Sequence, residues 1–178
     1  MTLKLLQWNP MSLVQAGREQ EISERFKQFP ICVLVGTQIR AMQGRQIFER
    51  DLEQHKAVHF GYGRGGLTNK SCGISIMLHK RWFRAPQIAT RWCAGERNAA
   101  IRGRGGAVRL RSGRFDITVI GIYIAPRPSR AEPKAKWIRQ VDAVCEWIEW
   151  LLTQLPARTT PMLALDLNDG LGRPATTD

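Results

Sequence analysis

The sequence predicts an α/β protein in which helices cover mixed, largely antiparallel sheets. Apolar residues recur at helical spacing in two segments, and several shorter apolar segments are bounded by turn residues, as strands are. The predicted order is strand, helix, strand, several consecutive strands, helix and strand. Because helices and strands do not alternate regularly, a mixed sheet is favoured over a doubly wound parallel one. The 178 residues suit one domain with a sizeable core.

Two segments are predicted to be helices. Residues 16–29 place apolar side chains at helical spacing, and Pro30 ends the pattern. Residues 131–155 are the clearer helix, because six apolar residues recur there at three- and four-residue steps, and Pro156 ends it. These six form one apolar stripe: Trp137, Val141, Val144, Ile148, Leu151 and Leu155.

Strands are predicted where short apolar runs are bounded by turn residues. Residues 31–37 (ICVLVGT) have the continuous, β-branched composition of a strand that is buried on both faces. Residues 105–126 predict a hairpin that turns at Ser112-Gly113, with a long apolar return strand in a central position. The other expected strands are residues 4–9, 57–60, 72–79 and 161–167.

The charge of the chain suits a polyanionic partner such as DNA or RNA. The net charge is +12 and the isoelectric point is near 10.4, and 20 of the 27 basic residues are Arg. Guanidinium groups bind phosphate in a bidentate manner and stack on flat rings. The alternative is a generally basic, solvated surface. The arginines near the hairpin that would contact nucleic acid are Arg97, Arg102, Arg104, Arg109, Arg111 and Arg114.

Several other classes of site are disfavoured. Gly61, Gly63 and Gly66 match a dinucleotide fingerprint in spacing, but no helix start follows them. His55 and His59 have the spacing of zinc ligands without the Glu that accompanies it in metalloproteases. The four cysteines have no CxxC spacing, and no signal peptide or membrane-length apolar run occurs. We therefore expect an intracellular protein, in the nucleus or cytoplasm, that has no membrane partner; its oligomeric state stays open.

Polar residues stand at the ends of three expected strands. Asn9 follows the first strand, Tyr123 lies in the central one, and Asp166 and Asn168 follow the last. Strand ends that meet at one edge of a sheet are where α/β proteins build sites. Asp can act as a general base, and Asn and Tyr can orient or stabilise an anion. Each residue also has an ordinary structural interpretation, as a turn residue or a core aromatic.

Five stretches in chain order resemble motifs of the endonuclease/exonuclease/phosphatase superfamily. They are LKLLQWNPMSL, ICVLVGTQIR, CGISIMLHK, ITVIGIYIAP and PMLALDLNDG. The last, for example, resembles the Gly-Asp-Phe-Asn motif of that family. Each motif alone is weakly specific, whereas five in order are fairly specific. The nuclease domain of non-long-terminal-repeat retrotransposons is the member that the sequence resembles most.

The resemblance implies a four-layer α/β sandwich (the DNase I-like fold) over residues 1–178 and Mg²⁺-dependent cleavage of phosphodiesters in nucleic acid. Asn9 would contact the region of the metal and the phosphate. Tyr123 would hold the scissile phosphate, Asp166 would orient or deprotonate the attacking water, and Asn168 would steady the phosphate. Oxygen ligands and charge growing on phosphate oxygens both suit a hard cation such as Mg²⁺.

The sequence departs from this family at two points. Gly36 stands where the family has its metal-binding Glu, so the metal ligands are unknown. The sequence also stops before the last two strands of the family and the Ser-Asp-His that carries a catalytic histidine. Loss of such groups costs orders of magnitude in rate. We therefore expect a C-terminally incomplete member with weak or no activity. The alternatives are an active nuclease, a nucleic-acid-binding pseudoenzyme and a non-functional retrotransposon remnant.

Overall fold

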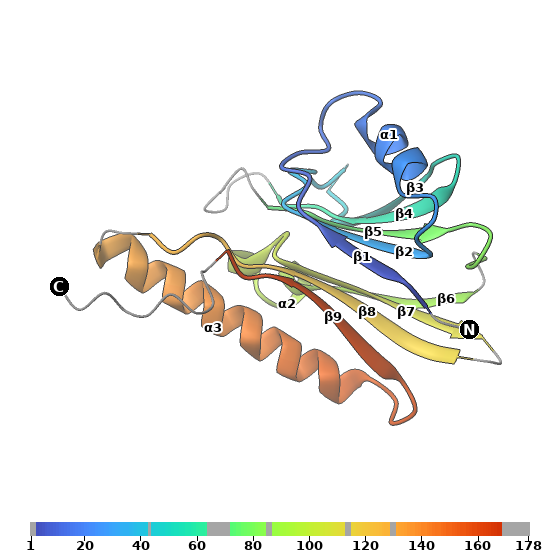
Figure 1. The fold of residues 1–178 in the computed structure, drawn as a ribbon. Helices are drawn as coiled ribbons and strands as arrows, with labels where there is room; N and C mark the ends of the chain where they lie inside the picture. The colour runs from blue at the N-terminus through green and yellow to red at the C-terminus, as the bar shows by residue number, and fades with distance from the viewer. Residues whose placement is uncertain are drawn as a thin grey trace, which may run out of the picture.

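The computed structural model describes residues 3–42, 44–63, 72–84, 87–112, 115–128 and 131–168. Two sheets stack face to face (Figure 1), with helix α1 (Arg18–Arg25) on the outer side of one sheet. Helix α3 (Ala131–Gln154) lies along the outer side of the other. The order of layers is helix, sheet, sheet and helix, which confirms the predicted four-layer sandwich.

The first sheet has five strands in the order β1-β2-β5-β4-β3. Strands β1 and β2 are parallel, and each of the other neighbouring pairs is antiparallel. Because β1 and β2 run in the same direction, the residues that follow them lie at one end of the sheet. The five strands are β1 (Leu5–Trp8), β2 (Ile31–Val35), β3 (Ile47–Asp51), β4 (His55–Phe60) and β5 (Ile74–His79).

The second sheet has four strands in the order β6-β7-β8-β9. The predicted hairpin is present as β7 and β8, whose residues pair from Gly105 with Ile122 to Ser112 with Phe115. Strand β9 runs parallel to β8, and helices α2 (Ala94–Arg97) and η2 (Ala99–Ile101) connect β6 to β7. The strands are β6 (Ile88–Cys93), β7 (Gly105–Ser112), β8 (Phe115–Tyr123) and β9 (Thr160–Asp166).

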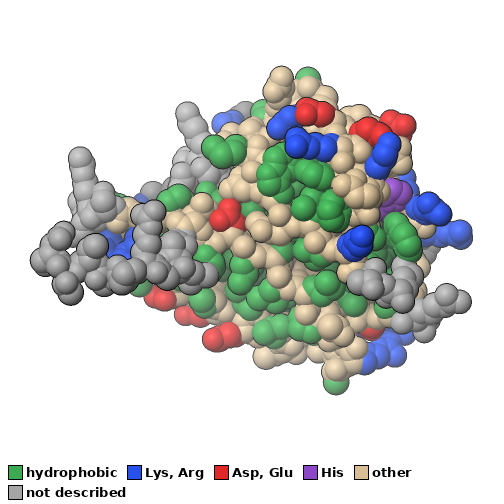
Figure 2. All heavy atoms as spheres, in the orientation of Figure 1, with side chains coloured by type: hydrophobic (Ala, Val, Ile, Leu, Met, Phe, Trp, Pro, Cys, Tyr) green, Lys and Arg blue, Asp and Glu red, His purple; other side chains and the backbone are tan. Residues whose placement is uncertain are grey.

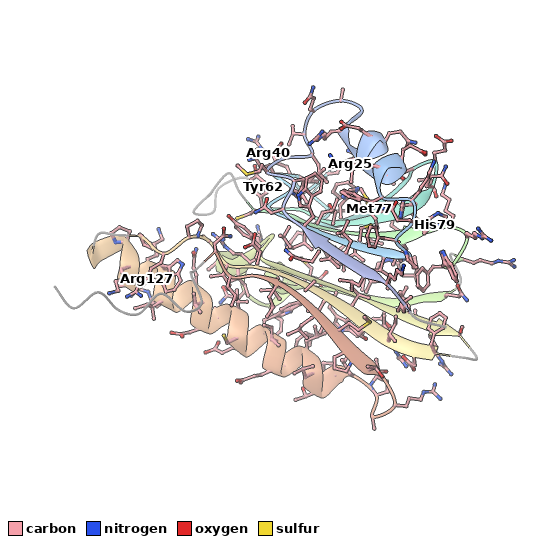
Figure 3. The ribbon with its side chains drawn as sticks, viewed as in Figure 1. Arg25, Arg40, Tyr62, Met77, His79 and Arg127 are labelled. Carbon is pink, nitrogen blue, oxygen red and sulfur yellow. The ribbon has the colours of Figure 1, made fainter. Side chains whose placement is uncertain are left out.

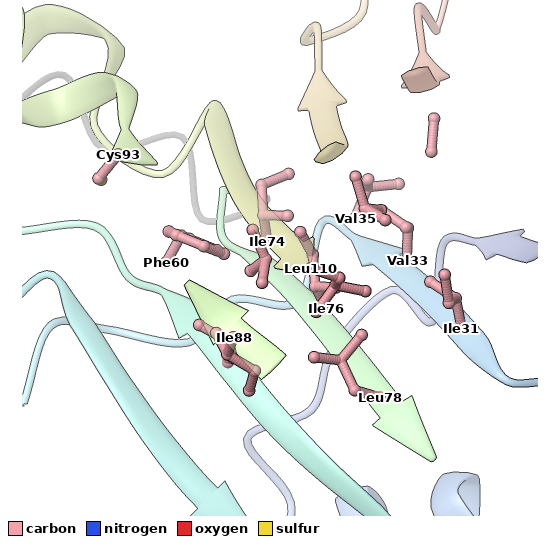
Figure 4. Packing of buried hydrophobic residues seen from close by; sticks show 14 of the residues in the cluster. Ile31, Val33, Val35, Phe60, Ile74, Ile76, Leu78, Ile88, Cys93 and Leu110 are labelled. Carbon is pink, nitrogen blue, oxygen red and sulfur yellow. The ribbon is translucent and has the colours of Figure 1, made fainter. Parts of the chain in front are cut away.

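The main core lies between the two sheets. Strands β2 and β5 contribute alternate residues such as Val33, Ile74 and Ile76, which are fully buried (Figure 4). A Cβ atom at Gly121 of β8 would lie 2.7 Å from a methyl carbon of Ile74 and 2.8 Å from one of Val33. The sheets therefore approach each other closely at that point, and only a residue without a side chain fits.

The helices complete two further apolar layers. The stripe on α3 packs on the second sheet, where Val144, Trp147 and Leu151 are buried. Ile22 of α1 packs in the same way on the first sheet. No helix in the described part of the chain has the length and apolar composition needed to cross a membrane.

Strand β9 forms an edge of the second sheet within the described residues. Leu163 and Leu165 on this strand are 44% and 40% exposed. On the face that Figure 2 presents, hydrophobic side chains gather across the middle of the molecule, with Lys and Arg side chains scattered around them. Apolar surface is thus in contact with solvent along this side.

Two strands were not predicted from the sequence. Strand β3 has the sequence IFERD, whose charged residues hide the apolar pattern. Glu49 of β3 forms ion pairs with Lys56 of β4, at 2.7 Å, and with Arg91 of β6. Strand β6 has the sequence IATRWC, and only its two end residues, Ile88 and Cys93, are buried. Partners from other strands stabilise both segments, and a single sequence does not reveal such partners.

Candidate functional site

The ends of β1, β2, β8 and β9 meet at one end of the sandwich. Asn9 follows β1 of the first sheet, and Asp166 ends β9 of the second. The side-chain amide of Asn9 donates a hydrogen bond of 2.8 Å to Oδ2 of Asp166, which joins the two sheets across 157 residues of sequence. Tyr123, the last residue of β8, pairs with Asp166 in the parallel ladder. Three of the four predicted catalytic residues are therefore neighbours.

Side chains at this end point into the space between the sheets. Val119, Tyr123 and Ala164 are buried in the inter-sheet core. Because side chains alternate along a strand, Asp166, two residues beyond Ala164, faces the same side. Tyr123 is 3% exposed, whereas Asp166 remains accessible to solvent in part. The carboxylate therefore lies at the mouth of the inter-sheet space.

Asn168 shapes the turn after β9. Its backbone N–H donates to Oδ1 of Asp166 at 3.2 Å, and its side-chain Nδ2 donates to the carbonyl oxygen of Ile124 at 2.9 Å. Both oxygens of the Asp166 carboxylate thus accept hydrogen bonds from amides. Because the Asn168 amide donates to the backbone, its side chain anchors this turn to the residue after β8. The role of Asn168 in steadying a phosphate stays a prediction.

Arg104 is a further polar residue at this site, in a position that was not expected. Its side chain is 3% exposed, and its guanidinium carbon lies 5.5 Å from the centroid of the Tyr123 ring. Among the described residues, its Nη1 has no hydrogen-bond partner. The backbone N–H of Tyr123 donates to the carbonyl oxygen of Arg104 at 2.9 Å, so the two residues are adjacent across the sheet.

The sequence analysis placed Arg104 among the arginines near the hairpin that would contact nucleic acid, and the structure shows that this side chain is buried. Val108 and Leu110 of β7 point inward, whereas Arg104 lies in the turn before that strand, where strand alternation gives no signal. The burial of Arg104 is therefore visible only in the structure. A buried cation with a free donor is costly in a protein interior unless an anion completes it.

Gly36 has a conformation that excludes the expected glutamate. Its φ is +67°, a region that non-glycine residues rarely adopt. A Cβ atom built there would lie 2.9 Å from Oδ1 of Asn9, so the Asn9 side chain occupies the space that a side chain at this position needs. A glutamate at position 36 would therefore require a change of backbone conformation and of the Asn9 side chain in this fold.

Among the described residues, the donor set at these strand ends does not fit a Mg²⁺ site. No group of three or more His, Cys, Asp or Glu side chains that could hold a metal lies within the described residues. Asp166 supplies a carboxylate here, but Asn9 and Gly36 beside it supply none, so these described strand ends offer one carboxylate. Mg²⁺ prefers octahedral oxygen coordination that includes carboxylates. The magnesium dependence that the resemblance implies therefore finds no support in these residues.

Unusual backbone conformations concentrate at this end of the fold. The described residues other than glycine include three with positive φ, and each lies two residues beyond Asn9, Gly36 or Asp166. Such conformations cost of order 1–2 kcal/mol each and cluster at functional sites. Their coincidence with the strand ends independently supports a functional site here. The three residues are Met11 (φ 64°), Gln38 (φ 59°) and Asn168 (φ 47°).

The structure separates the predicted basic residues into two groups. Arg102 and Arg104 precede β7 at the site end, whereas Arg109 and Arg111 lie toward the hairpin turn at its other end. Arg109 forms a bidentate ion pair with Asp116, with N–O distances of 2.8 and 2.6 Å. The guanidinium of Arg97 stacks on the Trp150 ring at 4.4 Å from its centroid. Arg114 lies outside the described residues.

The two histidines with zinc-like spacing are buried in strand β4. His55 hydrogen bonds through Nδ1 with Ser23 at 3.0 Å, and His59 hydrogen bonds through Nδ1 with Ser75 at 2.8 Å. Burial lowers the pKa of His55, so the neutral ring is favoured. These contacts assign both rings to the packing of α1 and the strands beneath it.

Comparison with known proteins identifies the fold. No family model matches the sequence, and a search of curated proteins finds no match. An AP endonuclease from Leishmania major is similar in structure, with a TM-score of 0.65 and 14% identity over 93% of this chain and 55% of that protein. A beta toxin from Staphylococcus aureus has a TM-score of 0.52 and 14% identity over 97% of this chain and 68% of the toxin.

A third solved structure is the endonuclease domain of TRAS1, a telomere-specific non-LTR retrotransposon, with a TM-score of 0.45, 14% identity, and coverage of 94% of this chain and 59% of the domain. Identities at this level show the fold alone. The similarity to the Leishmania endonuclease and to the beta toxin shows that the chain has the predicted DNase I-like fold. It spans about half of the Leishmania endonuclease (55%).

Proposed function

We propose that this chain is a nucleic-acid-binding domain with a nuclease fold, which holds a phosphodiester at the strand ends and cleaves it weakly or not at all. DNA and RNA both supply this phosphodiester. The proposed pseudoenzyme was one of the alternatives that the sequence left open.

The observation that carries the proposal is the buried guanidinium of Arg104. A buried N–H donor without a hydrogen-bond partner costs about 1–3 kcal/mol, and Nη1 of Arg104 is such a donor among the described residues. Arg104 lies beside Tyr123, and Tyr123 is adjacent in the sheet to Asp166. A phosphate that enters between the sheets would complete the hydrogen bonding of Nη1 and neutralise the charge.

Weak catalysis follows from the donor set around Asp166. The carboxylate can orient a water molecule, but Gly36 supplies no second carboxylate beside it. Among the described residues around Asp166, Arg104 and neutral donors would stabilise the charge that develops on the phosphate oxygens. Removal of one component of a concerted site lowers rates by orders of magnitude. A magnesium requirement for any residual cleavage stays a prediction from the resemblance.

The composition and the structural neighbours support a nucleic-acid partner. The net charge of +12 favours association with a polyanion. The neighbour with a TM-score of 0.65 is an AP endonuclease, and endonucleases act on nucleic acid. A partner of this kind fits the predicted location in the nucleus or cytoplasm.

Binding to a fluorescein-labelled oligonucleotide in EDTA tests the proposal. Fluorescence anisotropy should give an association constant whose logarithm falls linearly with the logarithm of salt concentration, for single-stranded or duplex DNA or RNA. Failure of all of these oligonucleotides to bind at low salt would remove the proposal. A non-functional remnant would fail this test, and a remnant that does not fold would also lack a cooperative unfolding transition.

A further inference from the structure

A basic pocket lies at the same end of the molecule as the strand-end site, on the side of β4 and β6. It has a volume of about 530 Å³ and is lined by residues that include Arg40, Gln46, Tyr62, Gly63 and Arg102. Figure 3 shows Arg40 and Tyr62 together at one end of the five-stranded sheet, with His79 at the other end. Of these residues, the sequence analysis assigned Arg102 to nucleic-acid binding and named Gly63 only for its spacing.

Tyr62 fixes one side of the pocket. Its ring is 7% exposed, and its carbonyl oxygen accepts a hydrogen bond of 2.9 Å from the backbone N–H of Ala41. Nε of Arg40 donates to the Tyr62 hydroxyl at 3.3 Å, and the Arg40 guanidinium lies 5.9 Å from the ring centroid. The buried ring therefore holds the exposed Arg40 side chain against the pocket wall.

Two glycines fix the opposite side. The side chain of Arg102 passes between Gly63 and Gly95, where added Cβ atoms would lie 3.0 Å from its Nη1 and 2.4 Å from its Cγ. The same Cβ at Gly95 would lie 2.3 Å from Oε1 of Gln46, which accepts a hydrogen bond from the thiol of Cys93. The stem of Arg102 is therefore confined, so less rotamer entropy remains to be lost on binding.

The charge of the pocket is unbalanced. Its lining contributes two guanidinium groups and no carboxylate. In the described part of the chain, neither Arg40 nor Arg102 forms an ion pair, whereas other arginines such as Arg50 and Arg109 do. Paired guanidinium groups without a carboxylate are suited to a phosphate, since each can donate two parallel hydrogen bonds.

The pocket is positioned to act together with the site at the strand ends. From Asp166 in β9, the row of residues at this end passes through Tyr123 in β8 and Arg104 before β7. Beyond them, Gly103 packs on Tyr62, with its Cβ position 3.0 Å from that of the tyrosine. Two strand spacings of ~4.8 Å therefore lead from Asp166 to Arg104, and the contact between Gly103 and Tyr62 leads from there to the pocket.

We propose that this pocket binds a phosphate group between Arg40 and Arg102. The inference rests on the proposed function in one respect, namely that the phosphate belongs to the backbone of a nucleic acid that also reaches Arg104. A strand that crosses the end of the sandwich would place another phosphate here, several nucleotides from the one held between the sheets. A free nucleotide or pyrophosphate presents the same chemistry to the two guanidinium groups.

Charge-removal variants test the pocket. Binding of a labelled 12-nucleotide single strand in EDTA is measured from low to high salt for Arg40→Ala, Arg102→Ala and the double variant. Each single variant should weaken binding about tenfold at low salt. Each should also reduce the magnitude of the slope of log K against log salt by about 0.7, and the double variant should reduce that slope by about 1.4. Arg81→Ala is the matched control, because Arg81 is exposed and lies just beyond β5 at the opposite end.

The outcomes separate this proposal from the proposed function. If wild type binds the oligonucleotide but both pocket variants behave as Arg81→Ala does, the pocket proposal fails and the proposed function stands. If wild type does not bind, the proposed function fails and calorimetric titration with pyrophosphate decides the pocket. Pyrophosphate binding that is lost in Arg40→Ala and Arg102→Ala would then support a free phosphate ligand. No binding of pyrophosphate would overturn the pocket proposal as well.

Discussion

Substitution of Arg104 by methionine should raise stability and weaken nucleic-acid binding at the same time. The side chain is 3% exposed, and its Nη1 lacks a partner within the described residues. A buried donor without a partner costs about 1–3 kcal/mol, and methionine removes that cost while it fills a similar volume. Replacement of buried charged groups by apolar ones stabilises other proteins by about 1–4 kcal/mol.

The expected magnitude is measurable by thermal unfolding. For a domain of this size, 1 kcal/mol shifts the midpoint by about 2–4 °C. A gain of about 1–3 kcal/mol should therefore raise the midpoint of Arg104→Met by roughly 2–12 °C. The loss of a charge-assisted hydrogen bond to phosphate, about 1.5–3 kcal/mol, should weaken oligonucleotide binding by about 10- to 150-fold.

The opposite signs of the two changes make the test strict. Arg81→Met removes the same charge from an exposed position and should change neither quantity appreciably. If Arg104→Met instead lowers the midpoint and leaves binding unchanged, Arg104 is a structural residue. The reasoning that a phosphate completes its hydrogen bonds would then be refuted.

Three further substitutions have defined outcomes. Gly36→Glu should fail to create nuclease activity in a plasmid assay. The same substitution should lower the free energy of unfolding by about 1–2 kcal/mol or more, because the φ of residue 36 is +67° and the side-chain amide of Asn9 fills the space that a side chain there needs. Asp116→Asn should cost about 2–3 kcal/mol at pH 7 in a denaturant titration, because the carboxylate accepts a bidentate pair from Arg109. Gly95→Ala should displace Arg102 and weaken oligonucleotide binding several-fold, measured by anisotropy, with a loss of about 1–3 kcal/mol in stability.

The effect at Asp116 should depend on pH in a known direction. Hydrogen bonds from Arg109 hold the pKa of Asp116 below its usual value. Stabilisation by this carboxylate is therefore present above the unfolded-state pKa of about 3.9 and is lost as pH falls through the lower folded-state value. The difference in unfolding free energy between wild type and Asp116→Asn should narrow below about pH 4. A difference that stays constant down to pH 2 would contradict this account.

Two controls isolate the causes of these effects. Gly17 has a φ of +79°, and no atom lies within 4 Å of a Cβ added there. The loss of stability in Gly17→Ala therefore measures the cost of backbone strain without a steric clash. A loss at Gly36→Glu no greater than at Gly17→Ala would contradict the packing argument. Asp142→Asn changes an exposed carboxylate on α3 and should leave stability within about 0.5 kcal/mol of wild type.

The sequence predicts those parts of the fold in which every residue on the buried face is apolar. The run ICVLVGT and the stripe on α3 follow from burial alone, since every residue on one face is apolar. Strand β3 escapes prediction because Glu49 is stabilised by Lys56 and Arg91 from two other strands. The pairing of distant charged residues leaves no periodic signal in a single sequence.

The strand-end residues of the site could be predicted from the sequence, whereas the burial of Arg104 and the conformation of Gly36 could not. Asn9, Tyr123 and Asp166 each end or follow an apolar run, so the topology brings them together. The depth of Arg104 depends on how β7 and β8 are aligned, which composition does not reveal. The exclusion of a side chain at Gly36 depends on its φ and on Asn9, and it emerges only from the three-dimensional structure.

Incubation of supercoiled plasmid with the protein and Mg²⁺ or Mn²⁺ tests the central claim most directly. A mobility shift before deproteinisation reports binding, and nicked plasmid afterward reports cleavage in the same sample. Binding without turnover predicts a salt-sensitive shift and no nicking above that of Asp166→Ala. Metal-dependent nicking by wild type that Asp166→Ala abolishes would contradict the claim and establish the chain as an active nuclease.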